Sequence, residues 1–174
     1  RKSAENEYQA HHDSMTQLPN RILLSDRLST ALTVCKRKQS KLAILFVDLD
    51  NLKTINDVNG HTAGDGVLIE VAERMQNCLR ESDTVARIGG DEFTVLLPDV
   101  GTEEDAINVA EKIRSALIEP INVEGYTLKT SASIGIAIFP YHGLNATDLM
   151  NNADTAMYAA KSNGRNTIVM YGER

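Results

Sequence analysis

The sequence is poor in cysteine and has no long apolar run. Its two cysteines, Cys35 and Cys78, stand alone outside any CxxC or metal-ligand spacing, so they indicate buried thiols and neither redox nor zinc chemistry. The longest uninterrupted apolar stretch, Leu42 to Val47, is far too short to span a membrane, and no signal-peptide pattern begins the chain. We expect a cytoplasmic segment without direct membrane insertion, although a longer protein that contains it could be tethered through other parts.

Basic charge is also scarce. The formal net charge of −6 argues against a nucleic-acid partner, because proteins that bind nucleic acids usually carry a basic face. Between Glu81 and Glu111 the only basic residue is Arg87, which leaves this stretch strongly acidic. The motifs of P-loop proteins, of dinucleotide-binding folds and of HExxH zinc proteases are all absent, so those three kinds of site are not supported.

What remains is the composition of an ordinary globular protein. The 174 residues, 42% of them hydrophobic and 24% charged, suffice for one domain with a core and are too few for two. Residues 1–12 are polar and lack an apolar stripe, and we interpret them as a linker helix from an upstream module. Residues 13–174 form the predicted domain.

Hydrophobic periodicity predicts alternating helices and strands after a turn at 13–21. The apolar run at 42–47 indicates a central strand covered on both faces, and 84–88 and 93–97 are typical of two hairpin strands. The other expected elements are helices at 21–38, 52–58, 63–80, 102–117 and 147–162, strands at 121–123, 127–139 and 167–171, and a loop at 98–101. This order predicts an α+β fold with a ferredoxin-like β-α-α-β-β-α-β core, whose largely antiparallel sheet is flanked by helices.

The hairpin carries an unusual turn. Gly89 and Gly90 join the two strands, since glycine takes positive φ without steric cost, and Asp91 and Glu92 follow at the tip. Two adjacent carboxylates either form a solvated acidic turn or hold a cation, and the hairpin alone leaves both interpretations open.

Other charged residues favour the cation. Asp48 follows the central strand, and in a ferredoxin-like sheet the end of that strand and the hairpin can be neighbours. Carboxylates from two strand ends are suitable ligands for Mg²⁺ or Mn²⁺, which also take up substrate phosphates. The basic residues that could bind those phosphates are Lys53, Lys161 and Arg165.

Six motifs in order resemble the GGDEF domains of bacterial diguanylate cyclases, and the resemblance covers nearly the whole chain. The signature is Gly89-Gly90-Asp91-Glu92-Phe93. The other five are Asp13-x-x-Thr16-x-Leu18-Pro19-Asn20-Arg21, Asp48-x-Asp50-x-x-Lys53, Asn56-Asp57-x-x-Gly60-His61-x-x-Gly64-Asp65, Ser133-Ile134-Gly135-Ile136-Ala137 and Ala153-Asp154-x-Ala156-Met157-Tyr158-x-Ala160-Lys161-x-x-Gly164-Arg165-Asn166. Such domains are similar to the palm of adenylyl cyclases and some polymerases.

The resemblance implies that two GTP molecules condense to cyclic di-GMP and two pyrophosphates, each 3′-hydroxyl attacking the other nucleotide's α-phosphorus. It assigns Mg²⁺ or Mn²⁺ to Asp48, the Leu49 carbonyl and Asp91, with Glu92 assisting. Either Asp91 or Glu92 is a candidate base for the 3′-hydroxyl. Because one domain holds one GTP, the resemblance also implies a catalytic homodimer.

The same resemblance assigns the substrate contacts. Asn56 and Asp65 would bind the guanine edge, since a carboxylate accepts from N1–H and the 2-amino group of guanine. It assigns the β- and γ-phosphates to Lys53, Lys161 and Arg165. It also gives Lys53 a catalytic role, in which its charge offsets the charge of the transition state. Gly89 and Gly90 would allow the nucleotide to approach the backbone.

Each of these residues also has a purely structural interpretation. Asn56 can be a helix-end residue, Asp65 an N-cap, and Lys161 with Arg165 a complement to a helix dipole. For Asp50 and Asp154 we favour structural roles, and for His61 a structural hydrogen bond.

A second site is indicated by Arg80-x-x-Asp83, which matches the family's product-inhibition motif. Arg114 or Lys112 is a candidate to complete this site. The alternative is that Arg80 and Asp83 form only an exposed i, i+3 pair.

Three residues, Gln17, Leu52 and Asn59, depart from the family pattern. Because the segment around Glu119-Pro120-Ile121 resembles GGDEF domains that precede an EAL phosphodiesterase, the alternative function is a silent GTP-binding module or a cyclic di-GMP receptor in such a protein.

Overall fold

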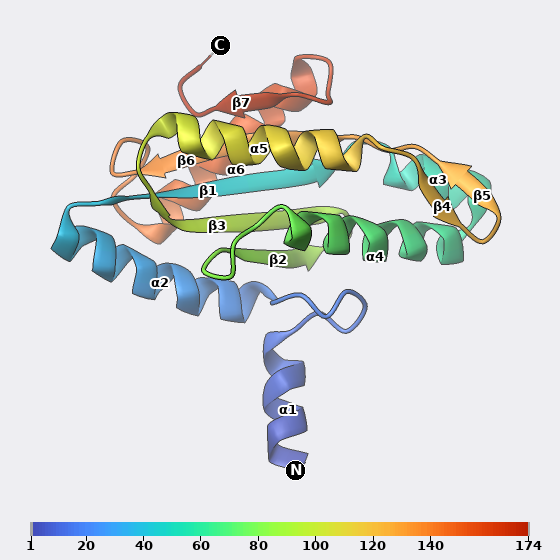
Figure 1. Ribbon diagram of the computed structural model, residues 1–174, viewed down its shortest axis with the longest axis horizontal. Helices are drawn as coiled ribbons and strands as arrows, with labels where there is room; N and C mark the ends of the chain where they lie inside the picture. Colours follow the sequence, from blue (N-terminus) through green and yellow to red (C-terminus); the bar gives the residue numbers. More distant parts are fainter. Residues whose placement is uncertain (1, 174) are drawn as a thin grey trace.

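A computed structural model describes residues 2–173, and its elements follow the expected order (Figure 1). The helices are α1 (Lys2–His11), α2 (Arg21–Lys38), α3 (Leu52–Asn59), α4 (His61–Asn77), α5 (Glu103–Leu117) and α6 (Ala146–Ser162). The strands are β1 (Lys41–Leu49), β2 (Thr84–Gly89), β3 (Glu92–Val100), β4 (Ile121–Val123), β5 (Tyr126–Leu128), β6 (Ala132–Phe139) and β7 (Ile168–Met170).

The main sheet has five strands in the order β2-β3-β1-β6-β7. β1 is antiparallel to both of its neighbours, β2 and β3 form the hairpin, and only β7 joins the sheet in parallel. The prediction of a largely antiparallel sheet is therefore confirmed. β4 and β5 form a separate two-stranded ribbon.

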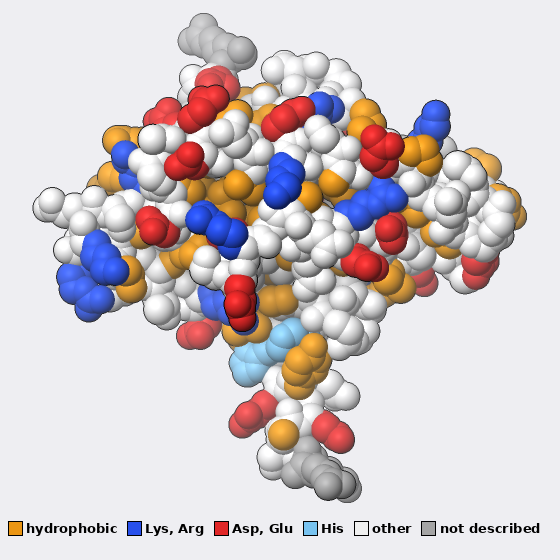
Figure 2. Space-filling model, viewed as in Figure 1, with side chains coloured by type: hydrophobic (Ala, Val, Ile, Leu, Met, Phe, Trp, Pro, Cys, Tyr) orange, Lys and Arg blue, Asp and Glu red, His pale blue; other side chains and the backbone are white. Residues whose placement is uncertain are grey.

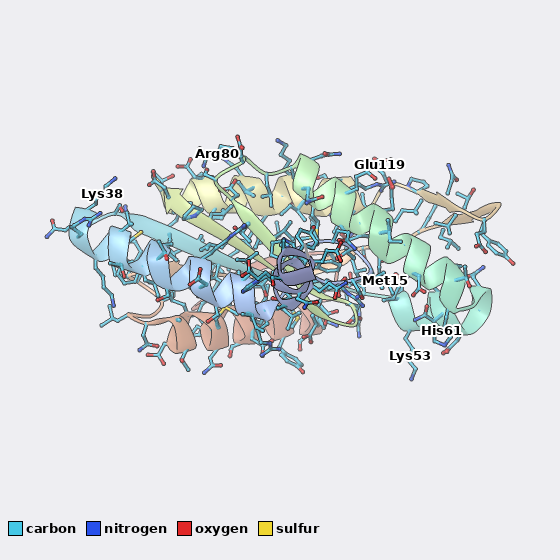
Figure 3. The ribbon with its side chains drawn as sticks, turned by 90° about the horizontal axis from the view of Figure 1, so that it is seen from below. Met15, Lys38, Lys53, His61, Arg80 and Glu119 are labelled. Atoms are coloured by element: carbon cyan, nitrogen blue, oxygen red, sulfur yellow. The ribbon has the colours of Figure 1, made fainter. Side chains whose placement is uncertain are left out.

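Helices cover both faces of this sheet, as the continuous apolar run in β1 predicts (Figure 3). Ala43, Leu45 and Val47 of β1 pack on the side of α4 and α5, whereas Leu42 and Ile44 pack on the side of α2 and α6. A strand alternates its side chains between the two faces, so a strand buried on both reads as an unbroken apolar run.

Polar caps fix the starts of three helices. The Asn20 side chain accepts hydrogen bonds from the first turn of α2, and Asn145 does the same for α6. Thr102 and Asp105 form a reciprocal capping box at α5. Lys161 lies in the last turn of α6, at the opposite end of that helix from its cap.

Three boundaries differ from the prediction. β3 continues through Pro98 to Val100, because its pairing with β1 is irregular there and needs no amide donor from proline. The expected strand 127–139 is broken at 129–131, so that its two halves belong to different sheets. α4 begins at His61 and ends at Asn77, a few residues earlier at both ends than the apolar stripe indicates.

The first helix leaves the body of the molecule. α1 extends away from the domain and exposes its side chains almost all round (Figures 1 and 2). Its side chains therefore contribute nothing to the main core, and its role as a linker from an upstream module stays a prediction. Among residues 2–173, no helix combines the length and the apolar character that crossing a membrane requires.

Candidate active site

The turn of the β2–β3 hairpin is short and contains little side-chain bulk. Gly89 pairs with Glu92, so the loop itself is Gly90-Asp91. Only Gly90 takes positive φ, +52°, although positive φ was expected of both glycines. A Cβ added to either glycine would meet open space, so both remain accessible to a ligand.

Arg87 ties this loop to the turn that precedes α2. Its Nε and Nη2 donate to the Gly90 carbonyl at 3.1 and 2.9 Å, and its Nη1 lies 3.2 Å from both carboxylate oxygens of Asp13. Burial acts to raise the pKa of Asp13, but hydrogen bonds from Thr16 and the charge of Arg87 outweigh it and lower the pKa. Sequence reasoning missed this contact, whose one signal is that Arg87 is the sole base in an acidic stretch.

Asp48, the last residue but one of β1, lies directly opposite Glu92 of β3. The residue is only 7% exposed; its Oδ2 lies 2.8 Å from Lys161 Nζ, and its Oδ1 is buried without a hydrogen-bond partner. Burial raises the pKa of Asp48 to about 6, the Lys161 ammonium opposes that rise, and the neighbouring Asp91 carboxylate adds to it. The expected juxtaposition of Asp48 with the hairpin acids is present.

This pair of carboxylates fits a hard divalent cation. Mg²⁺ is usually held by one or two protein carboxylates, with substrate phosphates and water completing the shell. Within residues 2–173, no group of three or more His, Cys, Asp or Glu side chains is arranged to hold a metal ion by itself, so substrate phosphates and water would have to complete the shell. The buried Asp48 Oδ1, which has no hydrogen-bond partner, is an oxygen available to such a cation. The buried Leu49 donates its amide to the Asp91 carbonyl at 3.2 Å, which holds the hairpin loop against the end of β1.

Glu92 lies slightly apart from this pair. It is exposed and lines a cleft of about 290 Å³ between the sheet and α6, together with Asp154 and Tyr158. Burial raises the pKa of Asp154. The two hairpin acids therefore have different surroundings, with Asp91 beside Asp48 and Glu92 at a cleft.

Two of the three basic candidates, Lys161 and Arg165, lie at the end of β1. Lys53 is exposed in the first turn of α3 and points away from the sheet (Figure 3). Lys161 pairs with Asp48, and Arg165 Nη1 lies 3.9 Å from Asp50 Oδ1. Asn51 precedes α3 but makes no side-chain cap, so it leaves the first-turn amides of that helix to other acceptors.

The guanine candidates lie where α3 meets α4. A Cβ on Gly64 would come within 1.7 Å of Asn56 Oδ1, so the Asn56 amide lies directly over that glycine. Asp65 is half-exposed inside α4, four residues after its start, which excludes the N-cap alternative. Asp57 and His61 are exposed, and no hydrogen bond from the His61 side chain supports the structural role expected of it among the described residues.

The Arg80-x-x-Asp83 motif forms a tight turn on another side of the molecule. Asp83 Oδ2 accepts from the Arg80 amide at 2.9 Å and lies 3.8 Å from its Nε, while Asp83 Oδ1 is buried without a partner. The turn lines a cavity of about 410 Å³ whose other wall includes Lys112 of α5. Arg114 is bonded to Glu111 and Asn166 instead. Figure 3 shows Arg80 on the opposite side from Lys53.

Comparison with known proteins agrees with this geometry. Residues 10–167 match the family model described as the diguanylate cyclase GGDEF domain. The diguanylate cyclase TpbB of Pseudomonas aeruginosa is 48% identical over 159 residues, which are 91% of this chain and 37% of that protein. MucR of the same organism, a bifunctional diguanylate cyclase and cyclic di-GMP phosphodiesterase, is 48% identical over 157 residues, 90% of this chain and 23% of that protein.

Solved structures show the same fold. The GGDEF domain of TpbB has a TM-score of 0.91 at 46% identity, covering 92% of this chain and 94% of that one. The coiled coil and GGDEF domain of DgcB from Caulobacter crescentus, in complex with cyclic di-GMP, has a TM-score of 0.88 at 25% identity, covering 97% and 90%. The chain thus spans well under half the length of the curated relatives it matches, and nearly all of the solved single domains.

Proposed function

The chain belongs to the GGDEF family of diguanylate cyclases, and from that premise we propose that it condenses two GTP into cyclic di-GMP and two pyrophosphates. The observation that carries the proposal is the Asp48–Asp91 pair, with a buried, unpartnered oxygen on Asp48. A structural pair would have its oxygens satisfied by donors, because an unsatisfied buried carboxylate oxygen is costly. A cation site explains why Asp48 Oδ1 has no hydrogen-bond donor.

Recognition of guanine is assigned to Asn56 and Asp65. The Asp65 carboxylate accepts from N1–H and the 2-amino group, a donor pair that adenine lacks, and the Asn56 amide offers both a donor and an acceptor. Both side chains are partly exposed and lie on adjoining helices. Gly64 supports the pair, since any larger residue would displace Asn56.

The triphosphate then extends from this corner towards the end of β1. The free amides at the start of α3 and the side chains of Lys53, Lys161 and Arg165 supply positive potential along that path. Gly89 and Gly90 leave room for the nucleotide beside the hairpin. Lys53 also offsets the charge that develops on the leaving pyrophosphate.

At the reacting centre, Asp48, the Leu49 carbonyl and Asp91 hold Mg²⁺ or Mn²⁺, with Glu92 close by. The metal, when bound, lowers the pKa of the attacking 3′-hydroxyl and stabilises charge on the α-phosphate. Asp91 or Glu92 accepts the hydroxyl proton. Lys161 lies 2.8 Å from Asp48 Oδ2, and a cation held by Asp48 would leave the Lys161 ammonium available to the phosphates.

A single domain holds one GTP, so the reaction requires a second copy that presents its own nucleotide. We assign residues 1–12 to a linker helix from an upstream sensor module and residues 13–174 to the catalytic domain. Incubating the chain with GTP and Mg²⁺ should yield cyclic di-GMP with a rate per protomer that rises with protein concentration. Detectable GTP binding without product in a forced dimer would overturn the cyclase and favour a silent regulatory module, such as one attached to an EAL domain.

The Arg80-x-x-Asp83 cavity is a second candidate site, for the product. Arg80 is exposed and positive, Asp83 presents an unpartnered buried oxygen, and Lys112 faces them across the cavity. An arginine and a carboxylate suit the phosphate and guanine edge of cyclic di-GMP. Arg80→Ala and Lys112→Ala should each weaken product binding, measured by calorimetry, at least about tenfold. Unchanged affinity in both would exclude this site.

A further inference from the structure

The segment that follows α6 has a strained backbone. Gly164, Arg165 and Asn166 take φ values of +100°, +65° and +45°, three left-handed residues in succession. Asparagine tolerates this region, whereas an arginine pays a steric cost, and such a conformation persists only where its surroundings impose it. The strained residue is the same Arg165 that is assigned to the phosphates.

Asp50 imposes part of this conformation. Its side chain, only 6% exposed, accepts from the Asn166 amide at 3.1 Å and from the hydroxyls of Ser131 and Ser133. Because Asp50 directly follows β1, it joins the segment after α6 to the strand that carries Asp48. A buried carboxylate with this many donors holds its partners in one arrangement.

Arg114 holds the same segment from the other side. Its Nη1 donates to Asn166 Oδ1 at 2.9 Å, while Nε and Nη2 donate to Glu111 at 2.9 and 2.6 Å. The Arg114 side chain is 22% exposed and is fixed by these bonds to the face of α5. Asn166 is therefore gripped twice, by its backbone amide and by its side chain.

The Arg165 side chain has little to fix it, whereas its backbone amide donates to the Ala160 carbonyl at 3.1 Å. Its side chain is 51% exposed, and its only charged neighbour among the described residues is Asp50 at 3.9 Å. The direction of its guanidinium thus depends on the backbone conformation of the segment. A long flexible side chain contributes most to binding when its starting direction is set in advance.

We propose that Asp50, Asn166 and Arg114 are positioning residues that hold Arg165 ready for the β- and γ-phosphates of the nucleotide. The inference rests on the proposed binding of GTP but not on turnover. It explains why the buried Asp50 accepts a hydrogen bond from the backbone amide of Asn166. It also explains why Arg165 has a left-handed backbone conformation.

The test compares the affinities for GTP and GMP, measured by calorimetry without metal so that no turnover occurs. Wild type should bind GTP more tightly than GMP, and Arg165→Ala should reduce that ratio by about tenfold. Asn166→Ala and Arg114→Gln should remove most of the same factor and leave GMP affinity unchanged. Asn163→Ala, at an exposed position of the same turn, is the matched control and should have no effect.

Two further variants separate positioning from general stability. Asn166→Gly accepts positive φ and keeps the amide donor to Asp50, so it should lose less than Asn166→Ala. In the Arg165→Ala background, Asn166→Ala should cost nothing more, because no guanidinium remains to be positioned. Thermal unfolding followed by circular dichroism verifies that each variant is folded.

The outcomes distinguish this inference from the function on which it rests. A wild-type chain that binds GTP no better than GMP contradicts the assignment of the phosphate site and the positioning role together. A second outcome overturns the positioning role alone. In that outcome wild type prefers GTP over GMP and Arg165→Ala loses the preference, but folded Asn166→Ala and Arg114→Gln keep it. Equal losses for GTP and GMP in those two variants would reduce their role to fold stability and would also overturn the proposal.

Discussion

The two ends of the candidate substrate site are built differently. At the end of β1, Asp48 is paired with Lys161 and Asp50 with Arg165. At the corner of α3 and α4, Asp65 takes part in none of the ion pairs found within residues 2–173. The phosphate end thus holds two ion pairs before substrate binds, and we call it the closed end. The guanine end holds none among the described residues, and we call it the open end.

This difference indicates which end of the site must rearrange when substrate binds. Under the proposed function, a cation and a triphosphate would have to replace the ion pair between Lys161 and Asp48. Within the described part of the chain, the guanine edge would meet no such ion pair at Asp65. We therefore expect changes at the phosphate end to affect turnover, metal dependence and stability, whereas changes at the guanine end affect affinity and base selectivity.

The largest effect is expected at the closed end. Asp91→Asn removes one of the two carboxylates and should lower kcat on the order of 1,000-fold, with a much smaller change in GTP affinity. Product formation measured against GTP concentration separates the two parameters. Asp99→Asn changes an exposed acid on β3, the strand that follows Asp91, and should behave as wild type.

A change at the open end should act on binding instead. Gly64→Ala drives a methyl group into the Asn56 amide, whose Oδ1 would be 1.7 Å away, and should raise the KM for GTP by about 30-fold. Thr62→Ala, an exposed change in the same helix, is the control. A drop in kcat with an unchanged KM would contradict the division between the two ends.

Base selectivity should change by less. If Asp65 accepts from the 2-amino group, wild type should prefer GTP over ITP, which lacks that group, by about tenfold. Asp65→Asn should reduce this preference, as measured by the kcat/KM ratio for the two nucleotides. An unaltered ratio, with Asp57→Asn as the reference, would place guanine recognition elsewhere.

The smallest effect concerns stability and pH. The pKa of Asp48 is raised to about 6, so its ionised form costs the folded state free energy above pH 6, and the cost vanishes as the carboxylate protonates below it. Asp48→Asn, inactive for lack of a ligand, should therefore raise the free energy of unfolding by roughly 1 kcal/mol at pH 7.5 without metal, since the lost Lys161 pair offsets part of the gain. Urea unfolding at pH 7.5 and pH 5 should show the gain shrinking at pH 5. A loss of stability at pH 7.5 would mean that the ion pair outweighs the cost of burial.

Local patterns predicted most of the fold. The apolar run of β1, the caps Asn20 and Asn145 and the hairpin glycines each determine their element through short-range chemistry. The break at 129–131 was not predicted, because an alternating apolar pattern does not reveal that a strand changes sheet.

The site shows the same division. Motif order brought Asp48, Asn56, Asp65 and Asp91 into one hypothesis through a family resemblance, and their spacing alone left bland alternatives open. The contacts of Arg87 with Asp13 and of Arg114 with Asn166 join residues that are 74 and 52 positions apart in the chain. Such long-range pairs leave no periodic signal, so only the structure reveals them.

The distance along the chain that Asp50 bridges has a consequence for folding. Its hydrogen-bond partners Ser131, Ser133 and Asn166 lie 81, 83 and 116 residues further on. Contacts of such separation form late, after the chain has closed large loops, so the phosphate end is completed only when nearly the whole domain has assembled. Nucleotide binding should accordingly report global rather than local unfolding, and a chain truncated before α6 should neither bind GTP nor retain a stable β1.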